Sequence, residues 1–125
     1  MNLNNKILLV LFIIGSLNQL NAQTVNGNLL EDIPAKYVEI VATSKVFKPF
    51  QVTIYLDYGQ IGKMKETKKG WIIGDDGKAM SFNGVMGALN YLYKRGFKYI
   101  SKYAVSTGNG SVYRILLDNT NYKEE

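Results

Sequence analysis

The chain has 125 residues and a formal net charge of +5, and 46% of its residues are hydrophobic. This size and composition are typical of one folded domain. There is no cysteine and no histidine. The missing cysteine excludes disulfides, thiolate nucleophiles and cysteine-ligated metals, and the missing histidine removes the commonest general base and metal ligand. We therefore expect a protein that is not an enzyme and that uses no metal or other cofactor.

Residues 1–22 have the features of a secretory signal peptide. Lys6 gives a positive start, an unbroken apolar run covers 7–14, and Ala22 is the small residue that a signal peptidase requires. We predict cleavage between Ala22 and Gln23. The apolar run would span only about 12 Å as a helix, and there is no cysteine to carry a lipid. The processed protein is expected in the periplasm or outside the cell, without a stable membrane anchor.

Residues 23–35 are polar and contain Pro34, so we expect a flexible N-terminal segment, with a helical turn near its end, before a single domain over 36–118. Alternating apolar residues over 37–43 and 51–58 predict two antiparallel strands. The following stretch, 59–70, has three glycines and four lysines and no apolar period. It predicts a surface loop.

The second half of the chain predicts the rest of the fold. Residues 71–73 and 79–82 flank Gly-Asp-Asp-Gly, which is typical of a hairpin turn between two strands. With Asn83 as the N-cap, apolar residues recur at helical spacing until Gly96, which suits a helix C-terminus. Two strands over 97–106 and 112–118 and a polar tail over 119–125 complete the chain. The order ββββαββ predicts an α+β fold, a mainly antiparallel sheet with one helix on one face.

Two stretches of sequence resemble a known group of proteins. The segment FNGVMGALNYLYKRGFKYISKYAVSTGNGSVYRILL over 82–117 resembles small secreted Bacteroidetes proteins of unknown function, and KYVEIVATSKVFKPFQVTIYLDYGQ over 36–60 fits the same group. The chain is also distantly similar to small bacterial domains of unknown function whose helix ends in Gly-Trp, with Phe97 here in place of the tryptophan. The resemblance implies the predicted fold and export, and it implies no catalytic residue.

The predicted binding surface is aromatic and basic. Nine tyrosines exceed what so small a core needs, and amphipathic tyrosines make good contact surfaces. Simple alternation places Phe97, Tyr99 and Tyr103 on one face of their strand. We predict an interaction module that engages a protein or an anionic glycan, with export making nucleic acid an unsuitable partner. Its predicted ligand-binding residues are Tyr99, Tyr103, Tyr113, Trp71, Lys63, Lys65, Lys68 and Lys69.

Two alternative functions stay open at this stage. Small size, export and the lack of catalytic motifs also fit an inhibitor or immunity-type protein. A hydrolase that depends on carboxylates would use Asp57, Asp75 or Asp76, or pair Asp57 with Glu39 across neighbouring strands. For Asp75 and Asp76, a solvated hairpin turn is favoured over calcium binding, because their spacing matches no calcium loop.

Overall fold

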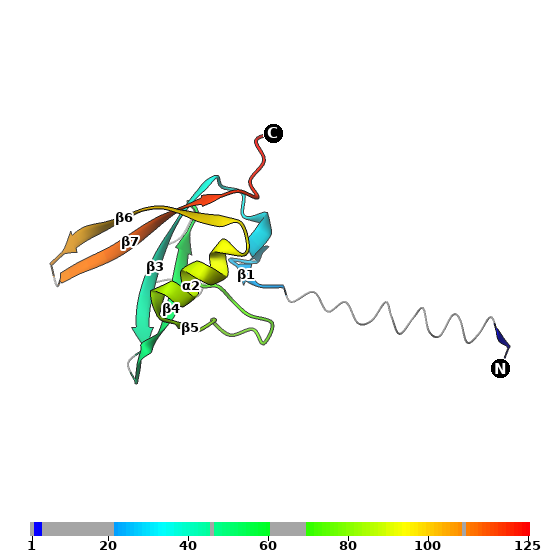
Figure 1. Cartoon of the computed structure of the whole chain (residues 1–125), viewed down its shortest axis with the longest axis horizontal. Coiled ribbons are helices and arrows are strands. Elements are labelled where there is room, and N and C mark those ends of the chain that lie inside the picture. Colours follow the sequence, from blue (N-terminus) through cyan, green and yellow to red (C-terminus); the bar gives the residue numbers. More distant parts are fainter. Residues whose placement is uncertain (1, 4–21, 46, 61–69, 109) are drawn as a thin grey trace.

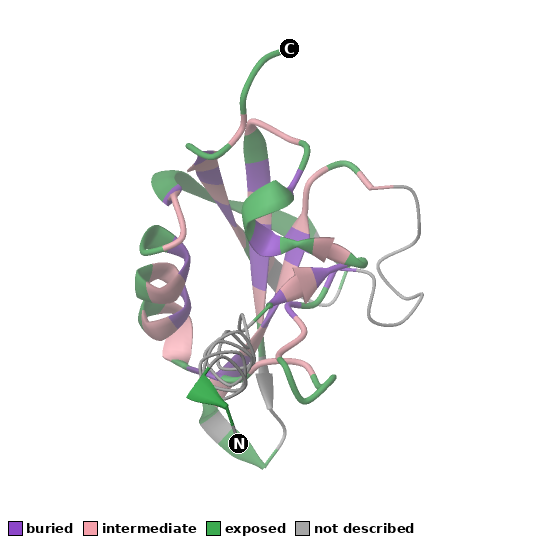
Figure 2. Cartoon of the chain, turned by 90° about the vertical axis from the view of Figure 1, so that its right-hand side faces the viewer, coloured by how far each residue is buried: buried purple, intermediate pink, exposed green. Residues whose placement is uncertain are grey.

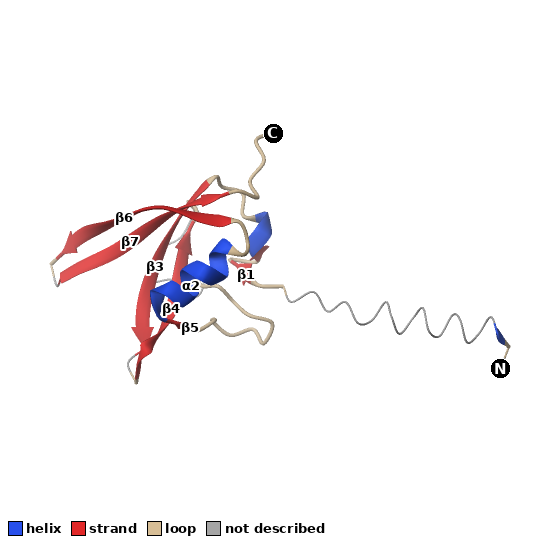
Figure 3. Ribbon diagram, in the orientation of Figure 1, coloured by secondary structure: helices blue, strands red, loops and turns tan. Residues whose placement is uncertain are grey.

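The computed structural model describes residues 2–3, 22–45, 47–60, 70–108 and 110–125. The main sheet has five antiparallel strands in the order β5-β4-β3-β7-β6 (Figure 1). The helix α2 (Gly84–Tyr93) lies across one face of this sheet (Figure 3). The predicted α+β class, a mainly antiparallel sheet with a helix on one face, is confirmed. The strands are β3 (Tyr37–Lys45), β4 (Lys48–Asp57), β5 (Phe82–Asn83), β6 (Phe97–Thr107) and β7 (Gly110–Asn119).

The core lies between the sheet and the helix. Alternate residues of β3 and β7 face the helix, so that Val38 is opposite Leu117 and Ile40 is opposite Ile115, and all four are buried. Figure 2 shows the buried side of α2 turned toward the sheet. The fully buried side chains include Val38, Ile40, Ile54, Leu56, Ile72, Ala88, Leu92, Phe97 and Leu117.

The ends of α2 match the sequence in part. Asn83 occupies the N-cap position, but its side chain makes no capping hydrogen bond to the first turn of the helix. After the helix, Gly96 has a φ of +86°, as predicted for the residue that ends it. Its carbonyl accepts hydrogen bonds from Thr120 N and Oγ1, both at 2.8 Å.

Within the described residues, no helix is long and apolar enough to cross a membrane.

The N-terminal segment contains the predicted helical turn, but the rest of it differs from its prediction. It forms a small ribbon from β1 (Thr24–Val25) and β2 (Asn28–Leu29), followed by the 3₁₀ helix η1 (Leu30–Asp32). Instead of a flexible approach to the domain, it packs Val25, Leu30 and Ile33 into the core, each at most 2% exposed. The apolar residues of this polar stretch are few and irregularly spaced and give no period, which is why the sequence pattern missed them. The core therefore begins before the expected boundary at Lys36.

Arg95 connects this segment to the end of α2. Its guanidinium stacks on the Tyr91 ring, 3.7 Å from the ring centre, and donates to Gln23 Oε1 at 3.2 Å. It also lies 3.8 Å from a carboxylate oxygen of Glu31. Burial raises the pKa of the Tyr91 hydroxyl. Arg95 therefore holds the N-terminal segment against the end of α2, where a cation also complements the helix dipole.

The segment over 70–81 forms a hairpin, but not the two strands expected. The turn at 74–77 is confirmed, with Gly74 N donating to Lys78 O at 2.9 Å. Around it, single antiparallel bridges join Trp71 to Tyr55, and Ile73 to both Thr24 and Ala79. Because the segment shares its backbone bonds among several neighbours, no continuous strand forms until β5.

Asn119 is the buried polar residue that joins the two ends of the domain. It is fully buried, and its amide nitrogen donates to Ile33 O at 3.1 Å and to Ala35 O at 2.9 Å. Its side-chain oxygen accepts from Asn121 N at 3.1 Å. Strand β7 extends through Asn119, although the sequence predicts that the strand ends at Asp118 and the polar tail begins at Asn119.

We predict that Asn119→Ala lowers the free energy of unfolding by about 1–3 kcal/mol, because the buried carbonyl of Ile33 and the partly buried carbonyl of Ala35 lose this donor. Urea denaturation measures the change. Asn83→Ala is the matched control, with an expected change of less than about 0.5 kcal/mol, since that side chain makes no capping hydrogen bond. Equal effects of the two substitutions would contradict the role given to Asn119.

Candidate functional site

An apolar groove of about 380 Å³ lies between α2 and the start of β6. The helix residues that line it occupy positions i, i+3, i+4 and i+7, so they form one stripe along the helix. Met86 and Tyr93 in this stripe are 66% and 63% exposed, and Tyr99 on the opposite wall is 58% exposed. A hollow with so much apolar surface at its rim is typical of a contact site. Its lining residues are Met86, Leu89, Asn90, Tyr93, Phe97 and Tyr99.

A β-bulge at Ile100 divides the tyrosines of β6 between the two faces of the sheet. Before the bulge, Tyr99 pairs with Leu117 on the helix side; beyond it, Tyr103 pairs with Arg114 on the opposite face. The prediction that Tyr99 and Tyr103 share one face is therefore wrong. An inserted residue shifts the alternation of side chains by one position. The sequence around the bulge has no glycine or proline to mark it.

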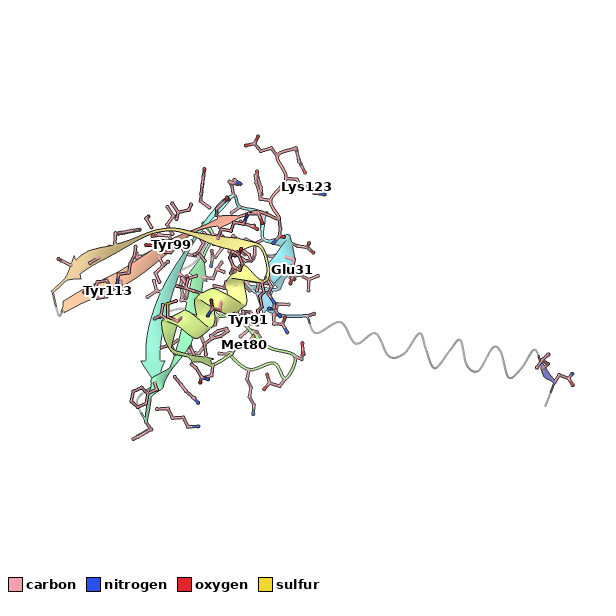
Figure 4. The ribbon with its side chains drawn as sticks, viewed as in Figure 1. Glu31, Met80, Tyr91, Tyr99, Tyr113 and Lys123 are labelled. Carbon is pink, nitrogen blue, oxygen red and sulfur yellow. The ribbon has the colours of Figure 1, made fainter. Side chains whose placement is uncertain are left out.

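The helix-side face continues outward along the β6–β7 hairpin. Tyr113 alternates with Ile115 and Leu117, so it lies on the same face as the groove. Beside it, the Lys102 ammonium is 4.7 Å from the centre of the Tyr113 ring, a cation–π contact. Figure 4 shows Tyr99 and Tyr113 at successive places along the hairpin. The groove residues together with Lys102 and Tyr113 are called the α2–β6 surface below.

The stretch of chain that forms the α2–β6 surface carries positive charge only. No aspartate or glutamate occurs between Asp76 and Asp118, a stretch that contains all of α2 and β6. Acidic residues instead line an open depression near the C-terminus, where Figure 4 places Glu31. The cations of the acid-free stretch are Lys78, Lys94, Arg95, Lys98, Lys102 and Arg114.

The other predicted binding residues do not join the α2–β6 surface. Trp71 is 38% exposed and bridges Tyr55 of β4, which β3 and β7 separate from β6. The predicted loop residues Lys63, Lys65, Lys68 and Lys69 lie outside the described part of the chain. Of the predicted set, the structure therefore brings together Tyr99 and Tyr113.

On the opposite face of the sheet, the proposed carboxylate pair belongs to a network of ion pairs. Glu39 and Asp57 are register partners on β3 and β4. Arg114 Nη1 lies 3.3 Å from a Glu39 oxygen and 4.0 Å from an Asp57 oxygen, and the Tyr103 hydroxyl donates to Glu39. These contacts connect four neighbouring strands. The network thus gives both carboxylates a cationic partner and a place in the sheet.

Asp75 and Asp76 lie in the confirmed hairpin turn. Asp76 Oδ1 accepts a hydrogen bond from Lys78 N at 3.0 Å, which is the usual role of aspartate in a turn. Within the described ranges, no group of three or more acidic, histidine or cysteine side chains is arranged to hold a metal ion.

Sequence reasoning missed the helix side of the groove. The helical spacing of apolar residues predicts that Met86 and Tyr93 pack with the core, whereas the structure buries Ala88 and Leu92 and leaves those two exposed. The available signal was the spacing of 86, 89, 90 and 93, which forms a second stripe beside the buried one. The long acid-free stretch was a further signal.

Comparison of the chain with known protein families, with curated proteins and with solved structures finds no match.

We predict that Glu39→Gln lowers the pKa of Tyr103. Three effects raise that pKa above 10.0, the ordinary value for tyrosine. The largest is the hydrogen bond to the Glu39 carboxylate, and burial and the negative charge of Glu39 add to it. Because the pKa of Tyr103 is higher in the folded than in the unfolded protein, its hydroxyl contributes fully to stability below the unfolded pKa. That contribution is lost as the pH rises through the folded pKa. NMR titration of tyrosine labelled at Cζ measures the shift, with Tyr103→Phe to assign the signal. An unchanged pKa would contradict the contact.

Proposed function

We propose that this protein is a non-enzymatic interaction module that holds an acidic segment of a partner protein on the α2–β6 surface. The observation that carries the proposal is the apolar groove with exposed aromatic rims, with Lys102 on the same face and no aspartate or glutamate in α2 or β6. Such a surface offers apolar contact area and selects negative charge in its partner. An inhibitor or immunity-type protein would be a special case of the same function.

A protein segment fits the groove better than an anionic glycan. The groove lies between a helix and a strand, and apolar atoms predominate in the side chains that line it. A peptide carries apolar side chains that enter such a hollow together with carboxylates that meet Lys102. An anionic glycan offers the charge without the apolar side chains. We therefore make glycan binding the competing outcome of the test.

We also propose that the protein is exported, with residues 1–22 as its signal peptide. This part of the proposal rests on the sequence pattern, since 4–21 lie outside the described residues. Export would place the partner in the periplasm or outside the cell.

The binding proposal is tested by selecting from a displayed library of random 12-residue peptides on the immobilised protein. We expect enrichment of peptides with both carboxylates and large apolar residues. For a selected peptide, Tyr99→Ser should weaken binding about tenfold, because it removes one wall of the groove. Lys102→Glu should weaken it further as salt is lowered, because repulsion replaces attraction. Fluorescence polarisation measures both changes.

Matched variants make this test specific. Tyr37 is 61% exposed and lies on the opposite face of the sheet, so Tyr37→Ser should leave the affinity within about twofold of the wild type. Lys48→Glu, at the start of β4, is the corresponding control for charge. The proposal would be overturned if no peptide were enriched, or if Tyr37→Ser and Tyr99→Ser lowered the peptide affinity equally. Tight binding of heparin that Tyr99→Ser does not change would also overturn it.

The export proposal predicts the mass of the processed protein. Expression of the full chain in a Gram-negative host should yield a periplasmic product that begins at Gln23. Ala22→Arg should block cleavage, because signal peptidases require a small residue there. Intact-mass spectrometry of cell fractions measures both results, with Ala22→Ser as the control that stays cleavable. A full-length cytoplasmic product from the wild-type chain would contradict export.

A further inference from the structure

Strand β6 ends the main sheet and has a free edge. It is 11 residues long, and its strand partner is β7 on one side only. Within the described residues, no backbone hydrogen bond reaches its other side. The strand contains no proline, which would prevent a neighbour from pairing. The free edge thus presents a row of N–H and C=O groups for another strand.

The outer half of β6 stands apart from the rest of the sheet. Pairing between β3 and β7 ends at Val41 and Arg114, whereas pairing between β6 and β7 continues to Thr107 and Gly110. Figure 1 shows the resulting hairpin extending beyond the other strands. The described residues from Lys98 to Ser106 are all exposed, on both faces of the ribbon.

The groove adjoins this free edge. Phe97 and Tyr99 belong to β6 and also form one wall of the groove. In a strand added beside β6, every second side chain would point to the helix-side face, toward Met86 and Tyr93. The edge would bind the backbone of an extended segment while the groove takes alternate apolar side chains, which is the division of roles seen in strand addition.

The charges of β6 favour an acidic partner over a second copy of this chain. If two copies of β6 paired, each would bring Lys98 and Lys102 to the other and no acidic residue to offset them, and like charges brought together destabilise a strand pair. The bulge places these lysines on opposite faces, because Lys98 pairs with Asp118 and Lys102 with Ile115. A partner strand with carboxylates on both faces would meet both lysines.

We propose that the partner's acidic segment binds as an extended strand added to the free edge of β6, with apolar side chains in the groove and carboxylates beside Lys98 and Lys102. This inference rests on the proposed function and specifies how the α2–β6 surface holds its partner. It also defines the ligand: a stretch of about five to seven residues with apolar side chains for the groove and at least one carboxylate on each face of the strand.

The test uses a peptide selected on the wild-type protein and two N-methylated forms of it. One form carries methyl groups on every second backbone nitrogen, and the other carries them on the alternate nitrogens. In an added strand, only one of these sets donates hydrogen bonds to β6. We expect one form to lose at least tenfold in affinity and the other to stay within about threefold of the parent peptide.

Amide hydrogen exchange of the labelled protein gives a second readout. Alternate amides of β6, those on its free edge, should exchange more slowly when the parent peptide is bound. Lys98→Glu should weaken binding of the parent peptide. Lys78→Glu, in the distant hairpin turn, is the control that should leave the affinity unchanged. Equal binding by both methylated forms, or equal loss in both, together with unchanged exchange in β6, would overturn strand addition. The parent peptide would still bind, so the proposed function would stand; failure to select any peptide would instead overturn that function.

Discussion

The buried side chain of Asn119 is the contact on which the rest of the domain depends. An amide in an apolar interior must be fully hydrogen-bonded, and this one is satisfied by the carbonyls of Ile33 and Ala35 and the amide of Asn121. It therefore fixes the N-terminal segment against the last strand. Thr120 and Asn121, which follow it, bind the backbone carbonyls of Gly96 and Arg95 at the end of α2. The position of one wall of the groove follows from these contacts.

The bulge at Ile100 decides which residues can act together. A regular strand would have placed Tyr103 beside Tyr99, but the extra residue sends Tyr103 to the ion-pair network of Glu39 and Arg114. It also brings Lys102 to the helix side, next to Tyr113. The two faces of the sheet thus differ in chemistry. One carries the ion-pair network of Glu39, Asp57 and Arg114, and the other holds the apolar groove with Lys102 and Tyr113 beyond it.

Sequence patterns predicted the fold better than the site, for physical reasons. The strands over 37–43 and 51–58 and the helix up to Gly96 follow from periodic burial and a positive φ, which are local properties. Packing of Val25, Leu30 and Ile33 depends on contacts with distant segments, so the sequence around them carries no signal. The bulge at Ile100 also depends on a distant segment, because the pairing of β6 with β7 determines where it forms. Tyr99 and Tyr113 were predicted individually, whereas the groove required the placement of α2.

The position of β3 in the sheet has a consequence for how the chain folds during synthesis. This early strand lies between β4 and β7, and Asn119 of β7 reaches back 86 residues to Ile33. The core therefore cannot close until the last strand is available, and long-range pairing of this kind folds slowly. A chain made from its N-terminus onward stays open for nearly the whole of its synthesis. If the protein is exported as proposed, that delay is an advantage, because a chain that crosses a membrane through a secretory channel must be unfolded.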